Sequence, residues 1–260
     1  MEVIVLGAES ERAALVADAI TDLLCGAADA VLGLATGSSP SPVYAELVRR
    51  HDVGQVSFAR ATAFSLDEYL GLPPGHPEGY RQVLEREFVG LVDLSAERLH
   101  TPDGQATDIV EACAAYEAAI VAAGGVDLQL LGIGSDGHLA FNEPGSSLAS
   151  RTRVKTLTPR TRADNARFFD SPDEVPHHVL TQGLGTILQA RHLVMLATGA
   201  GKAEAVRQAL EGPVSARCPA SVLQLHPHVT VVLDPAAASR LELVDYYLAV
   251  WADKPAWQGI

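Results

Sequence analysis

Cysteine is scarce in this chain of 260 residues. The three cysteines, Cys25, Cys113 and Cys218, are odd in number, and none belongs to a Cys-x-x-Cys pair. A disulfide framework normally uses cysteines in pairs, and a zinc ribbon needs closely spaced ones. The sequence therefore argues against both and suits a reducing compartment, so we expect a cytoplasmic protein.

Long apolar runs and positive charge are also lacking. No apolar run approaches the roughly 20 residues that a membrane-spanning helix needs, and Met1–Gly7 is too short for a signal peptide and lacks its basic start. Lys and Arg number 19 against 32 Asp and Glu, which gives a net charge of −13. Nucleic-acid binders use a basic face. We therefore expect no membrane and no nucleic-acid partner, and an anionic ligand would need a local cluster of donors and cations.

The chain does have the material for a sizeable core. Apolar residues make up 48% of the sequence and charged residues 20%, a balance that excludes wholesale disorder. The length fits one large α/β domain or two small ones. Since we find no repeat, low-complexity tract or convincing linker, we expect residues 1–260 to form a single domain.

Short β-like segments alternate with segments of helical spacing. Strands are expected at Val3–Leu6, Ala30–Ala35, Ala61–Ser65, Leu128–Ile133, His192–Ala197 and Val229–Leu233, and helices at Ala13–Leu24, Pro42–Arg50, Gly79–Phe88, Ile109–Ala122 and Lys202–Leu210. This order predicts an α/β fold, Rossmann-like and doubly wound, with a mainly parallel sheet and helices on both faces. Ligands bind beyond the carboxyl ends of such strands, where four segments bear polar groups.

The first segment is Gly134–Asn142, with Glu143 following directly. It places Asp136, His138 and Glu143 just after an apolar strand. A carboxylate can orient an imidazole and raise its basicity near neutral pH. Proton transfer is therefore the leading hypothesis for this segment.

Two other interpretations of the same segment fit less well. Gly132, Gly134 and Gly137 match the Gly-x-Gly-x-x-Gly pattern of dinucleotide-binding proteins, but that motif must open a helix, and Pro144 discourages one. Asp, His and Glu are also metal-ligand types. Their spacing lacks a helical His-x-x-x-His pattern, so we expect neither a nicotinamide cofactor nor a metal.

The second segment, Ala35–Pro40, lies between a strand and a helix. Its small residues would let backbone N–H groups approach an anion at the start of the helix, and its hydroxyls add donors. It can be a phosphate-binding loop or an ordinary turn in which a serine caps the helix. The sequence alone leaves both open.

The third segment, Phe64–Tyr69, contains adjacent acids after a strand. Asp67 and Glu68 can belong to a solvated turn, or one carboxylate can enter the cleft as a general base. On this segment alone the solvated turn is favoured.

The fourth segment, Thr198–Lys202, resembles a nucleotide-binding P-loop only superficially. Leu196 stands where that motif needs glycine, and Ala203 stands where it needs Ser or Thr. A lysine is disfavoured at the start of a helix. A bound phosphate would relieve that, whereas the alternative is a solvent-facing lysine.

Together these segments resemble the glucosamine-6-phosphate deaminase family, within the wider sugar-phosphate isomerase and lactonase group. The resemblance extends from about Leu32 to Asp234. It is carried by LGLATGSSP, SFARATAFSLDEYLGLPPGHPEGY, GIGSDGHLAFNEPGSSLASRTRVKTLT, ADNARFF, GAGKAEA and CPASVLQLHPHVTVVLD. The DGHLAFNEPGSSLASRTR run is long and specific.

The resemblance implies a reaction in amino-sugar catabolism, without cofactor or metal. Glucosamine 6-phosphate and water would give fructose 6-phosphate and ammonia by aldose–ketose isomerisation with deamination. Asp67 would move a proton between C2 and C1 of the sugar. His138 would open the sugar ring, oriented by Asp136 and Glu143.

The resemblance also implies binding groups. The phosphate would be held by Thr36, Gly37, Ser38, Ser39, Arg167 and Lys202, with Ser38 standing where many relatives have glycine. A lid is expected around residues 153–182. Ser146, Arg153 and Lys155 match activator-binding positions of allosteric hexameric relatives. Both hexamers and monomers occur in the family, so a homo-oligomer is one expectation.

Three alternatives stay open at this point. A phosphogluconolactonase-like hydrolase on the same fold would need a histidine but no C2 base. Galactosamine 6-phosphate would be a closely related substrate. A non-enzymatic sugar-phosphate sensor would normally carry a DNA-binding domain, and this chain begins directly with a predicted strand.

Overall fold

Seven parallel strands form the central sheet of this protein. The computed structural model describes residues 1–260, apart from the side chain of Ala256. The strand order is β1-β10-β9-β6-β2-β3-β5, and all neighbouring strands run parallel. The strands are β1 (Glu2–Val5), β2 (Val31–Leu34), β3 (Thr62–Ser65), β5 (Leu99–His100), β6 (Leu128–Gly132), β9 (His192–Ala197) and β10 (Val229–Leu233).

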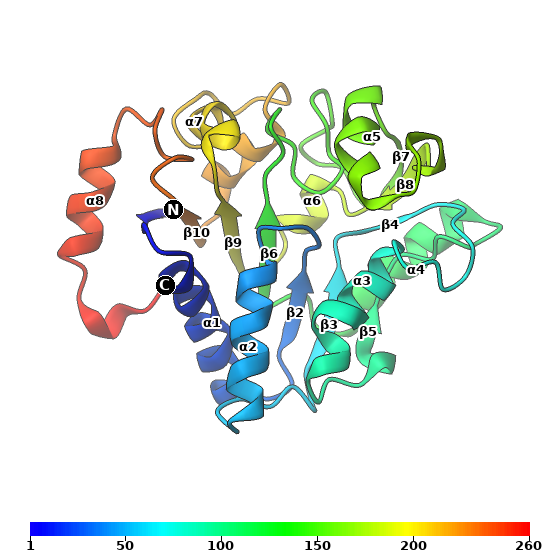
Figure 1. The fold of residues 1–260 in the computed structure, drawn as a ribbon, viewed down its shortest axis with the longest axis horizontal. Helices are drawn as coiled ribbons and strands as arrows, with labels where there is room; N and C mark the ends of the chain where they lie inside the picture. The colour runs from blue at the N-terminus through cyan, green and yellow to red at the C-terminus, as the bar shows by residue number, and fades with distance from the viewer.

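Helices surround this sheet, with α1 and α2 crossing in front of it and α6 behind it (Figure 1). They are α1 (Glu9–Gly26), α2 (Ser41–Asp52), α3 (Tyr80–Glu87), α4 (Ile109–Ala122), α5 (Pro159–Asn165), α6 (Leu184–Ile187), α7 (Ala203–Leu210) and α8 (Val244–Ala252). The predicted α/β class with a mainly parallel sheet is confirmed. None of the helices in the described part of the chain is both long and apolar enough to span a membrane.

The middle of the sheet is covered on both faces. All residues of β2, β9 and β10 are buried, as the continuous apolar runs predict. Their side chains join one large core with those of α1, α2 and α7. This rigid core fixes the ends of the strands, and it is at those ends that the polar segments lie.

A second, smaller sheet was not predicted. Its order is β4-β8-β7, and it joins β4 (Asp67–Tyr69) to β8 (His178–Thr181) and β7 (Arg153–Thr156) in antiparallel pairs. Figure 1 shows β7 and β8 beside α5, above the right-hand part of the central sheet. The predicted lid region 153–182 therefore contains two strands, of which β8 pairs with the segment of Asp67 and β7 pairs with β8.

The carboxyl ends of the parallel strands lie at one edge of the central sheet. The register aligns Leu34 with Ser65, Gly132 with Leu196, and Ala197 with Leu233. Ala35–Pro40, Leu66–Tyr69, Ile133–Glu143 and Thr198–Lys202 follow these strand ends directly. The edge predicted to bind ligands is therefore where all four polar segments emerge.

Candidate active site

The loop after β2 is open to an anion. Gly37 has φ +102°, a conformation that L side chains rarely adopt. The backbone N–H groups of Thr36, Gly37, Ser38 and Ser39 donate to no described residue. The capping alternative does not hold, because Pro40 is the N-cap and no side chain caps α2. Free N–H groups before a helix form a site that suits a phosphate.

Tyr44 holds the start of this loop from the core side. Its hydroxyl donates to the carbonyl oxygen of Ala35 at 2.7 Å and accepts from the Ala35 N–H at 3.1 Å. Tyr44 is fully buried in the core and stacks on Phe88, with ring centroids 4.8 Å apart. This contact was not predicted from the sequence, although Ala35 and Tyr44 are only nine residues apart and Tyr44 lies near the start of α2.

Asp136 and His138 form a pair in the loop after β6. The Asp136 Oδ1 lies 2.7 Å from the His138 Nδ1, although the ring N–H does not point directly at that oxygen. The backbone N–H of His138 also donates to Asp136 Oδ1 at 3.2 Å. The interaction with the imidazole lowers the pKa of Asp136 to about 2. Asp136 is therefore charged at neutral pH and lies where it can orient the ring; that role stays a prediction.

The glycines of this loop make room for the imidazole and not for a dinucleotide. A Cβ at Gly134 would lie 2.2 Å from the His138 Cε1. Gly137 has φ +84°, and a Cβ there would lie 2.5 Å from the Cys218 Sγ. The Gly-x-Gly-x-x-Gly pattern is thus explained by a tight turn that folds His138 back over Gly134.

Asp67 is buried at the start of β4. Asp67 is only 7% exposed, which rules out the solvated turn that the local sequence favours. Burial raises its pKa well above the ordinary value, and the neighbouring Glu68 raises it further. Glu68 instead accepts from the backbone N–H groups of Tyr69, Tyr80 and Arg81. A buried carboxylate of raised pKa is a stronger base, which suits proton abstraction.

Lys202 lies near the Asp136–His138 pair. Burial lowers its pKa, the charges of Asp164 and Asp136 oppose that shift, and Arg167 adds to it. The loop before it is anchored by Asp234, whose carboxylate oxygens each accept from the Gly199 N–H at 3.0 Å. A half-buried ammonium close to a guanidinium is unfavourable unless an anion joins them, so the arrangement suits a phosphate.

Arg167 belongs to the lid region. It is exposed in the short helix Ala166–Phe168, and its guanidinium lies 4.7 Å from the centroid of the Phe168 ring. Phe169 next to it packs on a small aromatic cluster that includes Tyr69 and Phe141. The predicted lid region therefore packs on the same element, β4, that contains Asp67.

No hydrogen bond or ion pair joins Glu143 to His138 in the described part of the chain. Its carboxylate accepts from the Thr158 hydroxyl at 3.0 Å and from the Thr161 hydroxyl, at the start of α5. The chain turns between the two residues, where Leu139 bridges to Asn142 and Ala140 has φ +50°. Glu143 thus anchors the lid, and its predicted partner, His138, is held by Asp136.

The three candidate activator residues lie on or near the lid. Arg153 and Lys155 are half-buried and alternate on β7, so they share one face of that strand. Ser146 is buried, and its hydroxyl has no hydrogen-bond partner among the described residues. Their activator-binding role stays a prediction.

Asp67 and His138 come from different segments that β8 connects. Asp67 pairs with Thr181 in β8, and the Thr181 hydroxyl accepts from the Phe141 N–H at 3.1 Å. Asp136 and Arg167 both lie close enough to Lys202 for their charges to shift its pKa in opposite directions. Among the residues whose side chains are described, no group of three or more His, Cys, Asp or Glu is placed to hold a metal ion.

Known proteins resemble this chain along its whole length. The family described as glucosamine-6-phosphate isomerases/6-phosphogluconolactonase matches residues 8–232. The chain therefore belongs to the glucosamine-6-phosphate isomerase/6-phosphogluconolactonase family. The glucosamine-6-phosphate deaminases of Pseudarthrobacter chlorophenolicus and Mycolicibacterium smegmatis are each 63% identical to it over 260 and 261 residues, covering 100% of both chains.

Solved structures agree with this assignment. A monomeric glucosamine-6-phosphate deaminase superposes with a TM-score of 0.90 at 43% identity, covering 92% of this chain and 100% of that one. The 6-phosphogluconolactonase from Trypanosoma cruzi superposes with a TM-score of 0.74 at 21% identity, covering 93% and 97%. At that identity the lactonase shows the shared fold alone.

Proposed function

We propose that this protein is a glucosamine-6-phosphate deaminase. It converts glucosamine 6-phosphate and water to fructose 6-phosphate and ammonia. The observation that carries the proposal is the buried carboxylate of Asp67, at the sheet edge where the Asp136–His138 pair and Lys202 also lie. The identity of 63% to named deaminases over the whole chain supports it.

The reaction needs two proton transfers at different atoms. His138 exchanges a proton with the ring oxygen, which opens the sugar, and Asp136 holds the imidazole during that step. Asp67 then removes the C2 proton and returns it to C1, while O1 gains a proton and the amino group loses one, so that the aldehyde becomes a hydroxymethyl group and C2 becomes an imine carbon. Water adds to that carbon, and ammonia leaves. Positioned acid–base groups each contribute about 10²–10⁴-fold.

The phosphate is far from the reacting carbons, and its binding orients the sugar. The N–H groups of Thr36–Ser39 and the cations of Arg167 and Lys202 provide its contacts. Binding energy from a remote group can hold the substrate near its reactive geometry. Glu143 supports this arrangement by holding α5 at the lid through Thr158 and Thr161.

A lactonase on the same fold is the main alternative. It would use a histidine to activate water and would not need a proton acceptor beside C2. The burial of Asp67 costs folding free energy, because its charged form is desolvated. A lactonase does not need a buried carboxylate that lowers its stability, so the deaminase is favoured.

One assay tests the proposed function directly. The purified protein is incubated with glucosamine 6-phosphate, galactosamine 6-phosphate or 6-phosphogluconolactone, without added metal. We expect ammonia and fructose 6-phosphate in equal amounts from the first compound. Hydrolysis of the lactone without ammonia release from either amino sugar would reverse the assignment.

Replacing Lys202 with methionine is expected to raise KM for glucosamine 6-phosphate by about 10–100-fold, with a smaller change in kcat. A hydrogen bond to a charged group contributes about 1.5–3 kcal/mol, and 1.4 kcal/mol corresponds to a factor of ten. Lys254→Met is the matched control, because Lys254 pairs with Glu2 at 2.6 Å in the C-terminal part of the chain. An equal KM change in both variants would contradict the phosphate role.

We also propose a cytoplasmic location. All three cysteines are free in the structure, with Cys25 exposed and Cys113 and Cys218 buried. Free thiols suit a reducing compartment, and a sugar phosphate is the substrate that the site favours.

A further inference from the structure

Gln182, directly after β8, joins the segment of Asp67 to the segment of His138. The backbone N–H of Gln182 donates to the Leu66 carbonyl oxygen at 2.8 Å, one residue before Asp67. The Gln182 carbonyl oxygen accepts from the Asn142 Nδ2 at 2.8 Å, four residues after His138. Gln182 therefore links the two segments, next to the link that Thr181 makes through its pairing with Asp67 and its hydroxyl.

The side chain of Gln182 adds a further contact to the same strand. Its Nε2 donates to the Ser65 carbonyl oxygen at 2.9 Å, and the Tyr116 hydroxyl donates to that oxygen at 2.5 Å. Gln182 is 1% exposed, so water does not compete for these bonds. One glutamine thus binds the two carbonyl groups that precede Asp67, one through its side chain and one through its backbone.

Asp67 depends on this backbone for its position. Burial and the charge of Glu68 are the influences on its pKa, and no hydrogen bond from a described residue holds its carboxylate. β3 ends at Ser65 and β4 begins at Asp67. The direction of the chain between these strands therefore decides where the carboxylate points. Gln182 holds the Ser65 and Leu66 carbonyl groups there, together with the pairing of Asp67 with Thr181 and the bond from the Leu66 N–H to Leu34.

We propose that Gln182 is a positioning residue for the proton acceptor Asp67. The proposal rests on the proposed deaminase function. A displacement of about 1 Å in a reacting group can cost about 10²-fold in rate. Loss of the Gln182 side-chain bond leaves the Tyr116 hydroxyl on Ser65, so a partial displacement and a loss of about 10-fold in kcat are expected.

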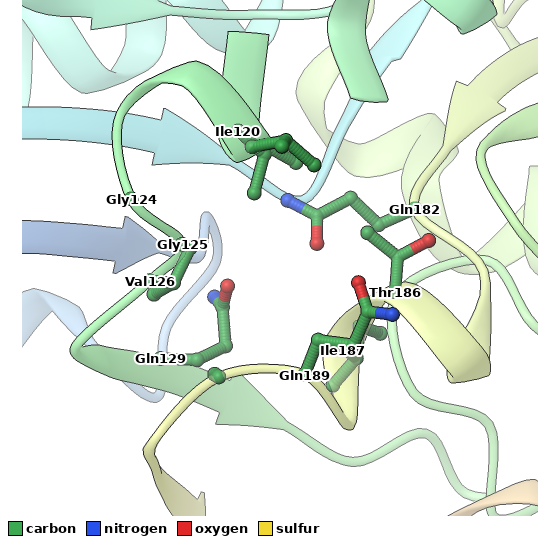
Figure 2. Close-up of a pocket in the computed structure, with 11 residues that line it drawn as sticks. Ile120, Gly124, Gly125, Val126, Gln129, Gln182, Thr186, Ile187 and Gln189 are labelled. Atoms are coloured by element: carbon green, nitrogen blue, oxygen red, sulfur yellow. The ribbon is translucent and has the colours of Figure 1, made fainter. Parts of the chain in front are cut away.

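The outer side of Gln182 faces a cavity of about 220 Å³ between α4, β6 and α6. Figure 2 shows the amide oxygen of Gln182 at this cavity, with Gln129 and Gln189 on other walls. The Nε2 atom donates its hydrogen bond to the Ser65 carbonyl oxygen, which explains why the amide oxygen faces the cavity. A shorter side chain at position 182 would extend this cavity to the Ser65 carbonyl group, so that a small amide could reach it.

The first test replaces Gln182 with methionine, which keeps the length of the side chain and all backbone bonds but removes the donor. We expect kcat for glucosamine 6-phosphate to fall about 10-fold while KM changes less than about 2-fold, because the phosphate contacts lie on other strands. Gln189→Met is the matched control in the same cavity and should keep the wild-type kcat.

The second test separates positioning from general loss of structure. Gln182→Ala should lose at least as much kcat as the methionine variant. Added propionamide should restore part of it in a saturable manner, because its N–H can replace that of Gln182. The same compound should have no effect on the wild type or on Gln189→Ala. Rescue by a small amide is not expected of a variant that is merely unstable.

Several outcomes would overturn the proposal. They are a wild-type kcat in Gln182→Met, an equal loss in Gln189→Met, a change confined to KM, or the absence of rescue. A crystal structure of Gln182→Met with the Ser65–Asp67 backbone unmoved would also refute it, whatever the activity. An inactive wild type would instead refute the deaminase function, and that crystal structure would still decide the positioning role.

Discussion

Asp67→Asn is expected to lower kcat for glucosamine 6-phosphate by about 10³-fold, within the range of a positioned acid–base group. Asparagine has nearly the same shape but cannot accept the C2 proton. Because the phosphate contacts are elsewhere, affinity for the reduced, acyclic amino-alditol 6-phosphate should change less than about 3-fold. Ammonia release measures the first effect, and calorimetric titration measures the second.

Glu68→Gln is the control for Asp67→Asn, since it changes the adjacent carboxylate. Glu68 accepts three backbone hydrogen bonds and does not face the substrate in the proposed mechanism, so its variant should retain far more activity. Normal turnover by Asp67→Asn would remove Asp67 from its role. In the wild type, activity should fall as pH drops through the raised pKa of Asp67, at a higher pH than an ordinary carboxylate would give.

The Asp67→Asn variant should be more stable than the wild type at neutral pH. Burial raises the pKa of Asp67 in the folded state, so the charged form costs folding free energy once pH exceeds the unfolded value of about 4. Asparagine resembles the protonated form. We expect its melting temperature to be higher by a few degrees at pH 7, with about 2–4 °C for each kcal/mol, and the difference should vanish below about pH 4.

Much of the fold could be predicted because its signals are local. The apolar runs of β6 and β9 and the helical spacing of α4 identify these elements without any knowledge of their partners. The small sheet was missed since β7 reads Arg153–Thr156 with alternating half-buried and exposed residues, and β4 has three residues. Such strands exist only because β8 pairs with both of them.

In the candidate site, too, the contacts between near neighbours could be predicted and the contacts between distant segments could not. Asp136 and His138 are two residues apart, so their contact follows from a short loop. Asp67 was chosen through resemblance, and its catalytic role stays a prediction. Its local sequence favoured a solvated turn, whereas the residue is buried, because burial depends on what packs over it. Glu143 and Gln182 have partners far along the chain, and no spacing in the sequence indicates them.

His138→Gln is expected to lower kcat on cyclic glucosamine 6-phosphate by about 10²-fold. Glutamine can form a hydrogen bond at the ring oxygen, but it cannot exchange a proton with it, so ring opening should become slow. Affinity for the acyclic amino-alditol 6-phosphate, whose chain is already open, should be nearly unchanged. An unchanged rate on the cyclic sugar would rule out the ring-opening role.

A pair of glycine variants tests the same histidine without altering it. Gly134→Ala places a Cβ 2.2 Å from the His138 Cε1, whereas a Cβ at Gly132 meets nothing within 4 Å. Gly134→Ala should therefore turn the imidazole away from Asp136 and reproduce the loss seen in His138→Gln, while Gly132→Ala keeps the wild-type kcat. If both alanine variants were fully active, the position of His138 over Gly134 would be irrelevant to catalysis, and the ring would have to act from another orientation.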